Sequence, residues 1–211
     1  MVFADRAEAG KKLAEKLKIF AGRPDVMLFA LPRGGAVVGE KVAKALNLPL
    51  DLIVTRKIGA PSNPEYAIGA LAETGELVWN EAERAAADPR AIRKIISDET
   101  EEAARRVKIY RHGRSLPDME GKTVLIIDDG LATGLTMRAA IAAARHQHAN
   151  KIIVVVPHGA RDSLDAIRKE VDEVVVLYEP EWYGAVGEFY ETFPQVEDEE
   201  VLTIMKAYGP K

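Results

Sequence analysis

The sequence predicts an α/β fold built on a doubly wound, mostly parallel sheet. Short apolar runs alternate with segments whose apolar residues recur at helical spacing, a pattern typical of parallel strands joined by helices that cover both faces of a sheet. The clearest apolar run, Thr123–Ile127, fits a strand buried on both faces. Because 211 residues suffice for one sizeable domain but not for two, we expect a single domain, 1–211, with its core at about 26–177.

Each element has its own signal in the sequence. Residues 5–20 carry apolar side chains on one helical face, which predicts an amphipathic helix. The dipeptide Asp88–Pro89 is typical of a helix start, and the apolar periodicity after it predicts a helix to about Arg111. The expected strands of the sheet are Val26–Leu31, Leu52–Thr55, Thr123–Ile127, Lys151–Val156 and Glu173–Leu177.

Two segments do not follow the strand and helix alternation. Residues 56–80 are rich in Gly and Pro, although Ile68–Ala72 and Glu76–Trp79 could pair as a hairpin. A loop of this length inside a compact domain is usually functional, so we expect a mobile loop at about 57–80. The aromatic-rich tail at about 178–211, with a helix expected from near Glu197, is interpreted as a small hood or cover over the site.

Composition narrows the classes of partner. The chain has 33 acidic and 29 basic residues, a net charge of −4 and no run of Lys or Arg, which argues against a nucleic-acid or membrane partner. It has no Cys, which excludes disulfides and thiol catalysis and fits a reducing compartment. The start has no apolar signal-peptide core, and no run approaches the ~18 apolar residues of a membrane span. We therefore expect a cytoplasmic protein.

The stretch after the strand at 123–127 carries the chemistry. Asp128 and Asp129 end the strand, and a turn containing Gly130 and Gly134 leads into a helix. A helix start rich in glycine and hydroxyl groups leaves backbone N–H groups free to surround an anion such as phosphate. Two neighbouring carboxylates need a partner that donates hydrogen bonds without adding negative charge, and a diol does so. A phosphate beside a diol indicates a sugar phosphate.

This stretch, TVLIIDDGLATGLT, resembles the phosphoribosyl pyrophosphate (PRPP) signature of type I phosphoribosyltransferases. The resemblance implies that Asp128 and Asp129 bind the ribose 2′ and 3′ hydroxyls. It also implies a 5′-phosphate loop made of Gly130, Leu131, Ala132, Thr133, Gly134, Leu135 and Thr136. The implied strand order is 3-2-1-4-5-6, with the third strand, around Glu76–Trp79, antiparallel, and a homodimer is expected. A Walker A loop is excluded because no Lys precedes Thr136, and no G-x-G-x-x-G fingerprint occurs.

Two further stretches resemble parts of the same family's site. LPRGG resembles the pyrophosphate loop, in which Gly34 and Gly35 allow close backbone approach and Arg33 offers a bidentate fork. That loop commonly holds a non-proline cis peptide in the family. Arg56 and Lys57 end the second expected strand, where the family often has a basic residue that reaches the pyrophosphate. The following GAPSNPEYAIGA matches a poorly characterised branch of the family.

The pocket for the base is less well marked. Ala132 stands where enzymes acting on 6-oxopurines usually have an Asp, which argues against hypoxanthine or guanine as substrate. Glu65 or Glu73 could replace that acid as general base, or be an exposed loop residue. His158, at the carboxyl end of an expected strand, could bind the base or cap the next helix. Trp182 lies in the tail, where the family often stacks an aromatic side chain on the base.

The charged face of the long helix is interpreted as structural. Glu102 and Arg106, like Glu101 and Arg105, are four residues apart, so their charges predict a solvated helix face stabilised by ion pairs.

The expected function is transfer of the 5-phosphoribosyl group from Mg·PRPP to a nitrogenous base, with release of pyrophosphate. Asp128, Asp129, Arg33 and Lys57 are the expected catalytic residues, and Mg²⁺ is expected to arrive with PRPP. The acceptor would be a purine, a pyrimidine or a related base. Two alternatives stay open: a regulatory PRPP- or nucleotide-binding protein of the same fold without catalysis, and an enzyme acting on another phosphorylated ribose.

Overall fold

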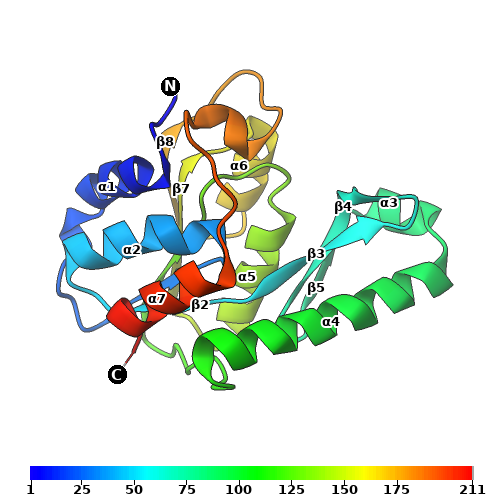
Figure 1. The fold of residues 1–211 in the computed structure, drawn as a ribbon, viewed down its shortest axis with the longest axis horizontal. Helices are drawn as coiled ribbons and strands as arrows, with labels where there is room; N and C mark the ends of the chain where they lie inside the picture. Colours follow the sequence, from blue (N-terminus) through cyan, green and yellow to red (C-terminus); the bar gives the residue numbers. More distant parts are fainter. Residues whose placement is uncertain (211) are drawn as a thin grey trace.

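Five parallel strands form the central sheet of the computed structural model, which describes residues 1–210 (Figure 1). Their order is β2-β1-β6-β7-β8. The strands are β1 (Val26–Ala30), β2 (Leu50–Leu52), β6 (Thr123–Ile127), β7 (Lys151–His158) and β8 (Glu173–Tyr178). The predicted fold class is confirmed. Because β1 lies beside β6, with Ala30 opposite Ile127, the turns that follow the two strands meet at one edge of the sheet.

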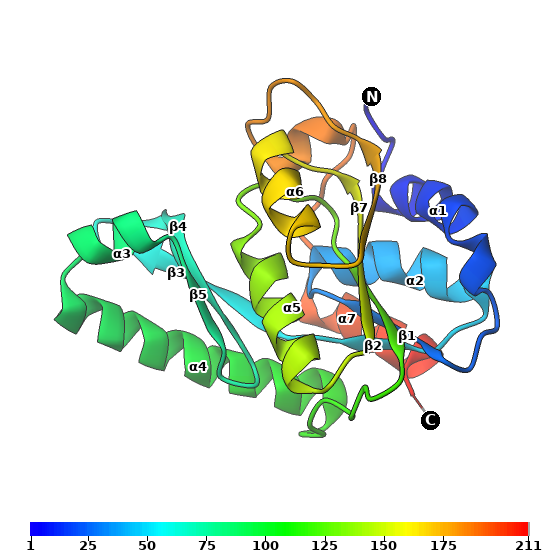
Figure 2. The same ribbon diagram turned by 180° about the vertical axis from the view of Figure 1, so that it is seen from behind.

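Helices cover both faces of this sheet, as Figures 1 and 2 show. One face carries α1 (Arg6–Lys16), α2 (Gly34–Leu46) and α7 (Asp198–Tyr208), and the other carries α5 (Leu135–His146) and α6 (Arg161–Arg168). The side chains of β6 alternate between two apolar clusters: Leu125 packs with the first group of helices and Ile126 with the second. This two-sided burial explains why the strand sequence is apolar throughout.

The remaining strands form a separate antiparallel sheet. It consists of β3 (Thr55–Ala60), β4 (Asn63–Ala72) and β5 (Leu77–Trp79), followed by α3 (Glu81–Ala86) and α4 (Pro89–Arg111). We call residues 55–111 the arm, because Figures 1 and 2 show this unit projecting to one side of the parallel sheet.

The arm differs from the predicted topology in the sheet that its last strand joins. The hairpin between Ile68–Ala72 and Glu76–Trp79 is confirmed, with Gly69 opposite Trp79. The third strand of the implied order is not part of the central sheet, because within residues 1–210 β5 pairs only with β4. The reason is that β2 spans three residues and the chain then leaves the central sheet to start β3 at Thr55. Residues 57–80 thus contain three strands, and their mobility stays a prediction.

Helix ends follow their local sequence signals. The Asp5 carboxylate accepts a hydrogen bond from the Glu8 amide and Asp88 from the Arg90 amide, which caps α1 and α4. Short 3₁₀ turns, η1 (Lys18–Phe20) and η2 (Val186–Phe189), complete the described elements. Of the helices in residues 1–210, none is long and apolar enough to cross a membrane.

A buried ion pair lies within the arm, next to the central sheet, because the Arg111 Nη1 also donates to the Leu52 carbonyl of β2 at 3.4 Å. Arg111, at the end of α4, is fully buried, and its Nη2 contacts Glu73 in the turn between β4 and β5. The other Glu73 carboxylate oxygen accepts a hydrogen bond from the Val54 amide at 2.8 Å. The interpretation of Glu73 as an exposed loop residue is wrong, and its role as a general base stays a prediction. Its side chain is only 6% exposed. Three residues further along the chain, Glu76 is 3.0 Å from the Nδ1 of His146, the last residue of α5. The 12-residue α5 separates that end from the predicted phosphate turn by about 18 Å.

We expect Arg111→Ala to destabilise the fold by about 3–5 kcal/mol, because it leaves the Glu73 carboxylate buried without a countercharge. Urea unfolding of the variant and the wild type would measure the difference. Arg114→Ala, at an exposed position of the following loop, is the matched control and should change stability by less than about 0.5 kcal/mol. Equal losses in the two variants would contradict the role of the buried pair.

Candidate functional site

Two glycine-bearing turns approach each other at the edge of the sheet. A Cβ atom on Gly34 would lie 1.9 Å from the Asp129 Oδ2, and one on Gly35 would lie 2.9 Å from the Ile127 carbonyl oxygen. Only glycine permits this approach at Gly34 without displacing the carboxylate. The Pro32–Arg33 peptide is cis, as the resemblance implies. The structure therefore brings the predicted pyrophosphate loop directly against the two predicted ribose-binding acids.

Residues near both ends of the sequence contact Asp129. Its Oδ2 is 2.7 Å from the Nε of Arg6, and the Tyr190 hydroxyl donates to its carbonyl oxygen at 2.5 Å. Arg6 also donates to the Pro194 carbonyl at 2.7 Å, and its guanidinium lies 3.7 Å from the centre of the Phe193 ring. Sequence reasoning missed Arg6, because a single Arg in the first turn of an amphipathic helix carries no local signal of such a contact.

Asp128 has a strongly altered acidity. Burial raises its pKa, and the neighbouring charge of Asp129 raises it further. The Asp129 amide donates to the Asp128 Oδ1 at 2.9 Å, and this bond and the Lys57 ammonium act in the opposite direction. Lys57, an exposed residue of β3, thus lies close enough to Asp128 for its charge to be felt. A carboxylate with perturbed acidity beside a flexible cation is a common feature of functional sites.

The turn after Asp129 presents a helix N-terminus. Gly134 adopts φ +73° at the N-cap of α5, and no side chain of the described residues, 1–210, caps this helix. Thr133 is exposed, whereas Ala132 and Thr136 are half-buried. Among residues 1–210, the amides of 132–136 have no hydrogen-bond acceptor. The positive end of the helix and these free donors form the arrangement that binds phosphate in many proteins.

The end of β7 supports this turn from behind. The Leu131 amide donates to the His158 carbonyl at 3.0 Å, and the Leu131 carbonyl accepts from the Ala160 amide at 2.8 Å. The Ser163 hydroxyl donates to the Ala132 carbonyl at 2.5 Å. These bonds use groups of the turn other than the free amides, so they fix its position while leaving those amides available.

The side chain of His158 lies beneath the site. It is fully buried, its Nδ1 is 3.0 Å from the Tyr183 hydroxyl, and burial lowers its pKa to about 4. The rings that surround it are those of Phe3, Tyr183, Phe189 and Tyr190. A Cβ atom on Gly130 would lie 2.6 Å from the His158 ring. The helix-cap interpretation is wrong, because α6 has no side-chain cap. Contact with a base stays a prediction, as it does for Trp182, whose side chain is 88% exposed.

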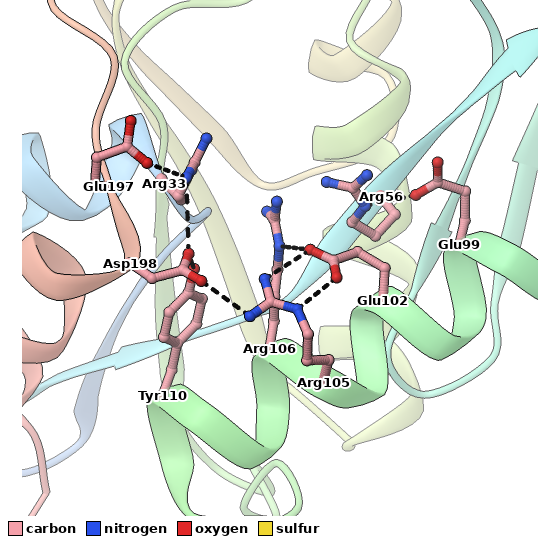
Figure 3. Close-up of polar contacts among 9 residues, drawn as sticks. All are labelled: Arg33, Arg56, Glu99, Glu102, Arg105, Arg106, Tyr110, Glu197 and Asp198. Carbon is pink, nitrogen blue, oxygen red and sulfur yellow. Dashed lines mark hydrogen bonds and ion pairs between the residues drawn. The ribbon is translucent and has the colours of Figure 1, made fainter.

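The two predicted arginines of the site point toward acidic side chains. The Arg33 Nη1 is 3.1 Å from the Glu197 Oε2 at the start of α7, and the Arg56 Nε is 2.6 Å from the Glu99 Oε2 on α4 (Figure 3). Although the backbone of Gly34 and Gly35 lies next to the two aspartates, the guanidinium of Arg33 forms an ion pair with Glu197.

Comparison with known proteins agrees with this geometry. The model of the phosphoribosyl transferase domain matches residues 4–193, and the chain therefore belongs to the phosphoribosyltransferase family. It is 39% identical over 206 residues to a Mycobacterium tuberculosis protein named "Putative phosphoribosyl transferase", an alignment that covers 97% of this chain and 46% of the relative. The chain thus spans about half the length of the curated relatives it matches.

Two other similarities are informative. The crystal structure of TT1426 from Thermus thermophilus superposes with a TM-score of 0.79 at 34% identity and covers 100% of both chains. The ribose-phosphate pyrophosphokinase of Pyrococcus furiosus is 41% identical over 61 residues, which are 28% of this chain and 22% of that protein.

We expect Asp128→Asn to stabilise the folded protein at pH 7 by about 0.5–2 kcal/mol, a typical gain when a functional site loses an unfavourable charge. A raised pKa means that folding favours the protonated carboxyl of Asp128. The free-energy cost of its charge to folding is therefore absent below the pKa of the unfolded state, about 3.9. This cost grows as the pH rises from there through the pKa of the folded state. Thermal unfolding at pH 4 and pH 7 would show a gain that shrinks in acid. Asp162→Asn, at an exposed position, is the control. A variant less stable than the wild type at pH 7 would contradict the unfavourable charge.

Proposed function

We propose that this chain binds Mg·PRPP and transfers its 5-phosphoribosyl group to a nitrogen atom of a base, releasing pyrophosphate. The observation that carries the proposal is the approach of Gly34 and Gly35 to Asp128 and Asp129. A loop suited to a diphosphate thereby adjoins two acids suited to ribose hydroxyls, and the free amides of 132–136 follow in the same turn. PRPP carries these three groups in this order: 5′-phosphate, ribose diol and diphosphate.

The chemistry requires positioning more than covalent work. The amides of 132–136 would bind the 5′-phosphate, and Asp128 and Asp129 would accept hydrogen bonds from the ribose hydroxyls. The base nitrogen attacks C1 of ribose, the bond from C1 to the diphosphate oxygen breaks, and pyrophosphate leaves with the bonding electrons. Lys57 and the amides of the glycine loop would stabilise the negative charge of the leaving group.

The donor set at the site fits magnesium as an ion that arrives with the substrate. Asp128 and Asp129 offer hard carboxylate oxygens beside the glycine loop. One of these oxygens, the Asp129 Oδ2, is paired with Arg6. Within residues 1–210, no group of three or more His, Cys, Asp or Glu residues is arranged as a metal site. When bound, Mg²⁺ would neutralise charge on the diphosphate and so make it a better leaving group.

An enzyme acting on another phosphorylated ribose is the second candidate. The similarity to a ribose-phosphate pyrophosphokinase favours it, because that relative is named for a ribose phosphate and not for a base. The two candidates differ in whether the diphosphate side of the site is used for leaving-group chemistry.

Lys57→Ala is expected to weaken binding of Mg·PRPP by about tenfold or more, while ribose 5-phosphate, which lacks the diphosphate, should bind almost as before. Calorimetric titration of both ligands would measure this difference. Lys16→Ala, an exposed cation at the end of α1, is the control. Replacing both Asp128 and Asp129 by Asn should weaken both ligands.

A panel of free bases with PRPP, monitored by release of pyrophosphate, would then test transfer itself. Equal losses for the two ligands in Lys57→Ala, together with no base-dependent release of pyrophosphate, would favour the second candidate.

A further inference from the structure

The two carboxylate oxygens of Asp129 have different surroundings. Oδ2 is 2.7 Å from the Arg6 Nε and lies against the backbone of Gly34, where a Cβ atom would be 1.9 Å from it. The same Cβ atom would be 3.1 Å from the Arg6 Nε, so the three groups meet at one point. Within residues 1–210, no donor forms a hydrogen bond with Oδ1. Asp129 therefore has one enclosed oxygen and one that is left without a protein partner.

Arg6 holds this carboxylate through a single hydrogen bond. Its Nε donates to Oδ2, whereas a bidentate pair would occupy both oxygens of Asp129. Its Nη1 donates to the Pro194 carbonyl at 2.7 Å, and its Cζ is 3.7 Å from the centre of the Phe193 ring. These contacts fix the plane of the guanidinium, so Arg6 can orient Asp129 while leaving Oδ1 unpaired.

Backbone hydrogen bonds place Arg6 beside the tail of the chain. The Glu191 amide donates to the Phe3 carbonyl at 2.8 Å. The Thr192 amide donates to the Ala4 carbonyl at 3.0 Å, two residues before Arg6. The side chain of Arg6 is only 8% exposed. An exposed ion pair between flexible side chains contributes little, whereas this pair joins groups that the surrounding structure already holds in place.

Asp128 is supported in a different way. Its Oδ1 accepts a hydrogen bond from the Asp129 amide within the same turn. The cation that acts on it is Lys57, an exposed residue of the arm with a flexible stem. Of the two acids, Asp129 is thus the one whose carboxylate is fixed by a buried cation.

An acceptor that is oriented before binding lowers the entropic cost of the contact it makes. We propose that Arg6 is a positioning residue of the ribose site: it fixes the Asp129 carboxylate so that Oδ1 accepts a hydrogen bond from a ribose hydroxyl. The inference rests on the proposed function and adds to the site a residue of α1. Arg6 does not touch the sugar in this arrangement, because it acts through Oδ2 of Asp129.

Two matched pairs of ligands, in which the second member lacks the ribose, test this role. Calorimetry would compare Mg·PRPP with Mg·pyrophosphate, and ribose 5-phosphate with inorganic phosphate. Arg6→Gln should weaken binding of both ribose ligands by about tenfold, while it changes binding of the two inorganic anions by less than about twofold. Arg6→Lys, which keeps the charge, should restore part of the loss.

A double-mutant cycle separates positioning from a general structural effect. Because Arg6 acts through Asp129, Asp129→Asn alone should weaken the ribose ligands at least as much as Arg6→Gln, and the double variant should bind them no more weakly than Asp129→Asn. Lys11→Gln removes the same charge from an exposed position of α1 and should change nothing. Urea unfolding would verify that each variant is folded under the conditions of the titration.

Three results would overturn the proposal. One is an equal loss of affinity for ribose ligands and inorganic anions in Arg6→Gln, and another is a set of additive losses in the double variant. The third comes from a crystal structure of the wild type with ribose 5-phosphate, which tests the contact without any substitution. The Asp129 Oδ1 should lie within about 3 Å of a sugar hydroxyl, and an Oδ1 that points away from the sugar contradicts the role of Arg6.

Failure of the proposed function is distinguishable from failure of this inference. If the wild type binds ribose 5-phosphate but not Mg·PRPP, phosphoribosyl transfer fails, and the second pair of ligands still tests Arg6. If the wild type prefers both ribose ligands to their inorganic partners and Arg6→Gln keeps that preference, only the role of Arg6 fails. If neither ribose ligand is preferred, both proposals are wrong.

Discussion

The contact between the turn after β1 and the turn after β6 determines the layout of the site. A side chain at Gly34 would occupy the position of the Asp129 carboxylate, so the approach exists only because two adjacent residues lack a Cβ atom. The parallel pairing of β1 with β6 sets the height of both turns, and α2 and α5 begin directly after them. The strand order thus brings the two turns together, and the spacing of the binding groups depends on their close backbone approach.

Each of the two aspartates at this contact has its own neighbouring cation. Arg6 neutralises Asp129 from the outside, Lys57 acts on Asp128, and the helix start of α5 is left without a side-chain cap. Away from the contact, the buried Arg111–Glu73 pair lies within the arm, beside the Leu52 carbonyl of the central sheet. Ion pairs near the turns are thus suited to ligand chemistry, whereas this distant pair is structural.

Local sequence patterns were sufficient for the central part of the fold. The run Thr123–Ile127 and the signals after it predicted the strand, the turn and α5, because all of them act over a few neighbouring residues. The position of the strand near Glu76–Trp79 was wrong, because a hairpin pattern does not reveal which sheet it joins. The site roles of Asp128, Asp129, Arg33 and Lys57 stay predictions, although the first two lie against the glycine turn as expected.

The residues that sequence reasoning missed make their important contacts over long separations or through burial. Arg6 contacts a residue 123 positions away, and no pattern in its own helix indicates this. Arg106 has the spacing of an ordinary surface ion pair with Glu102, yet the residue is only 9% exposed.

The short strand β3 has a consequence for how the site could diversify. Because side-chain direction along a strand has a period of two residues, deletion or insertion of one residue before Arg56 would exchange the faces served by Arg56 and Lys57. Such a register shift would turn the guanidinium of Arg56 toward the aspartates and the ammonium of Lys57 toward α4, although neither residue is replaced. The residues that β3 presents on its two faces are therefore linked. A change in the length of the chain before Arg56 that alters the residue on one face also alters the residue on the other.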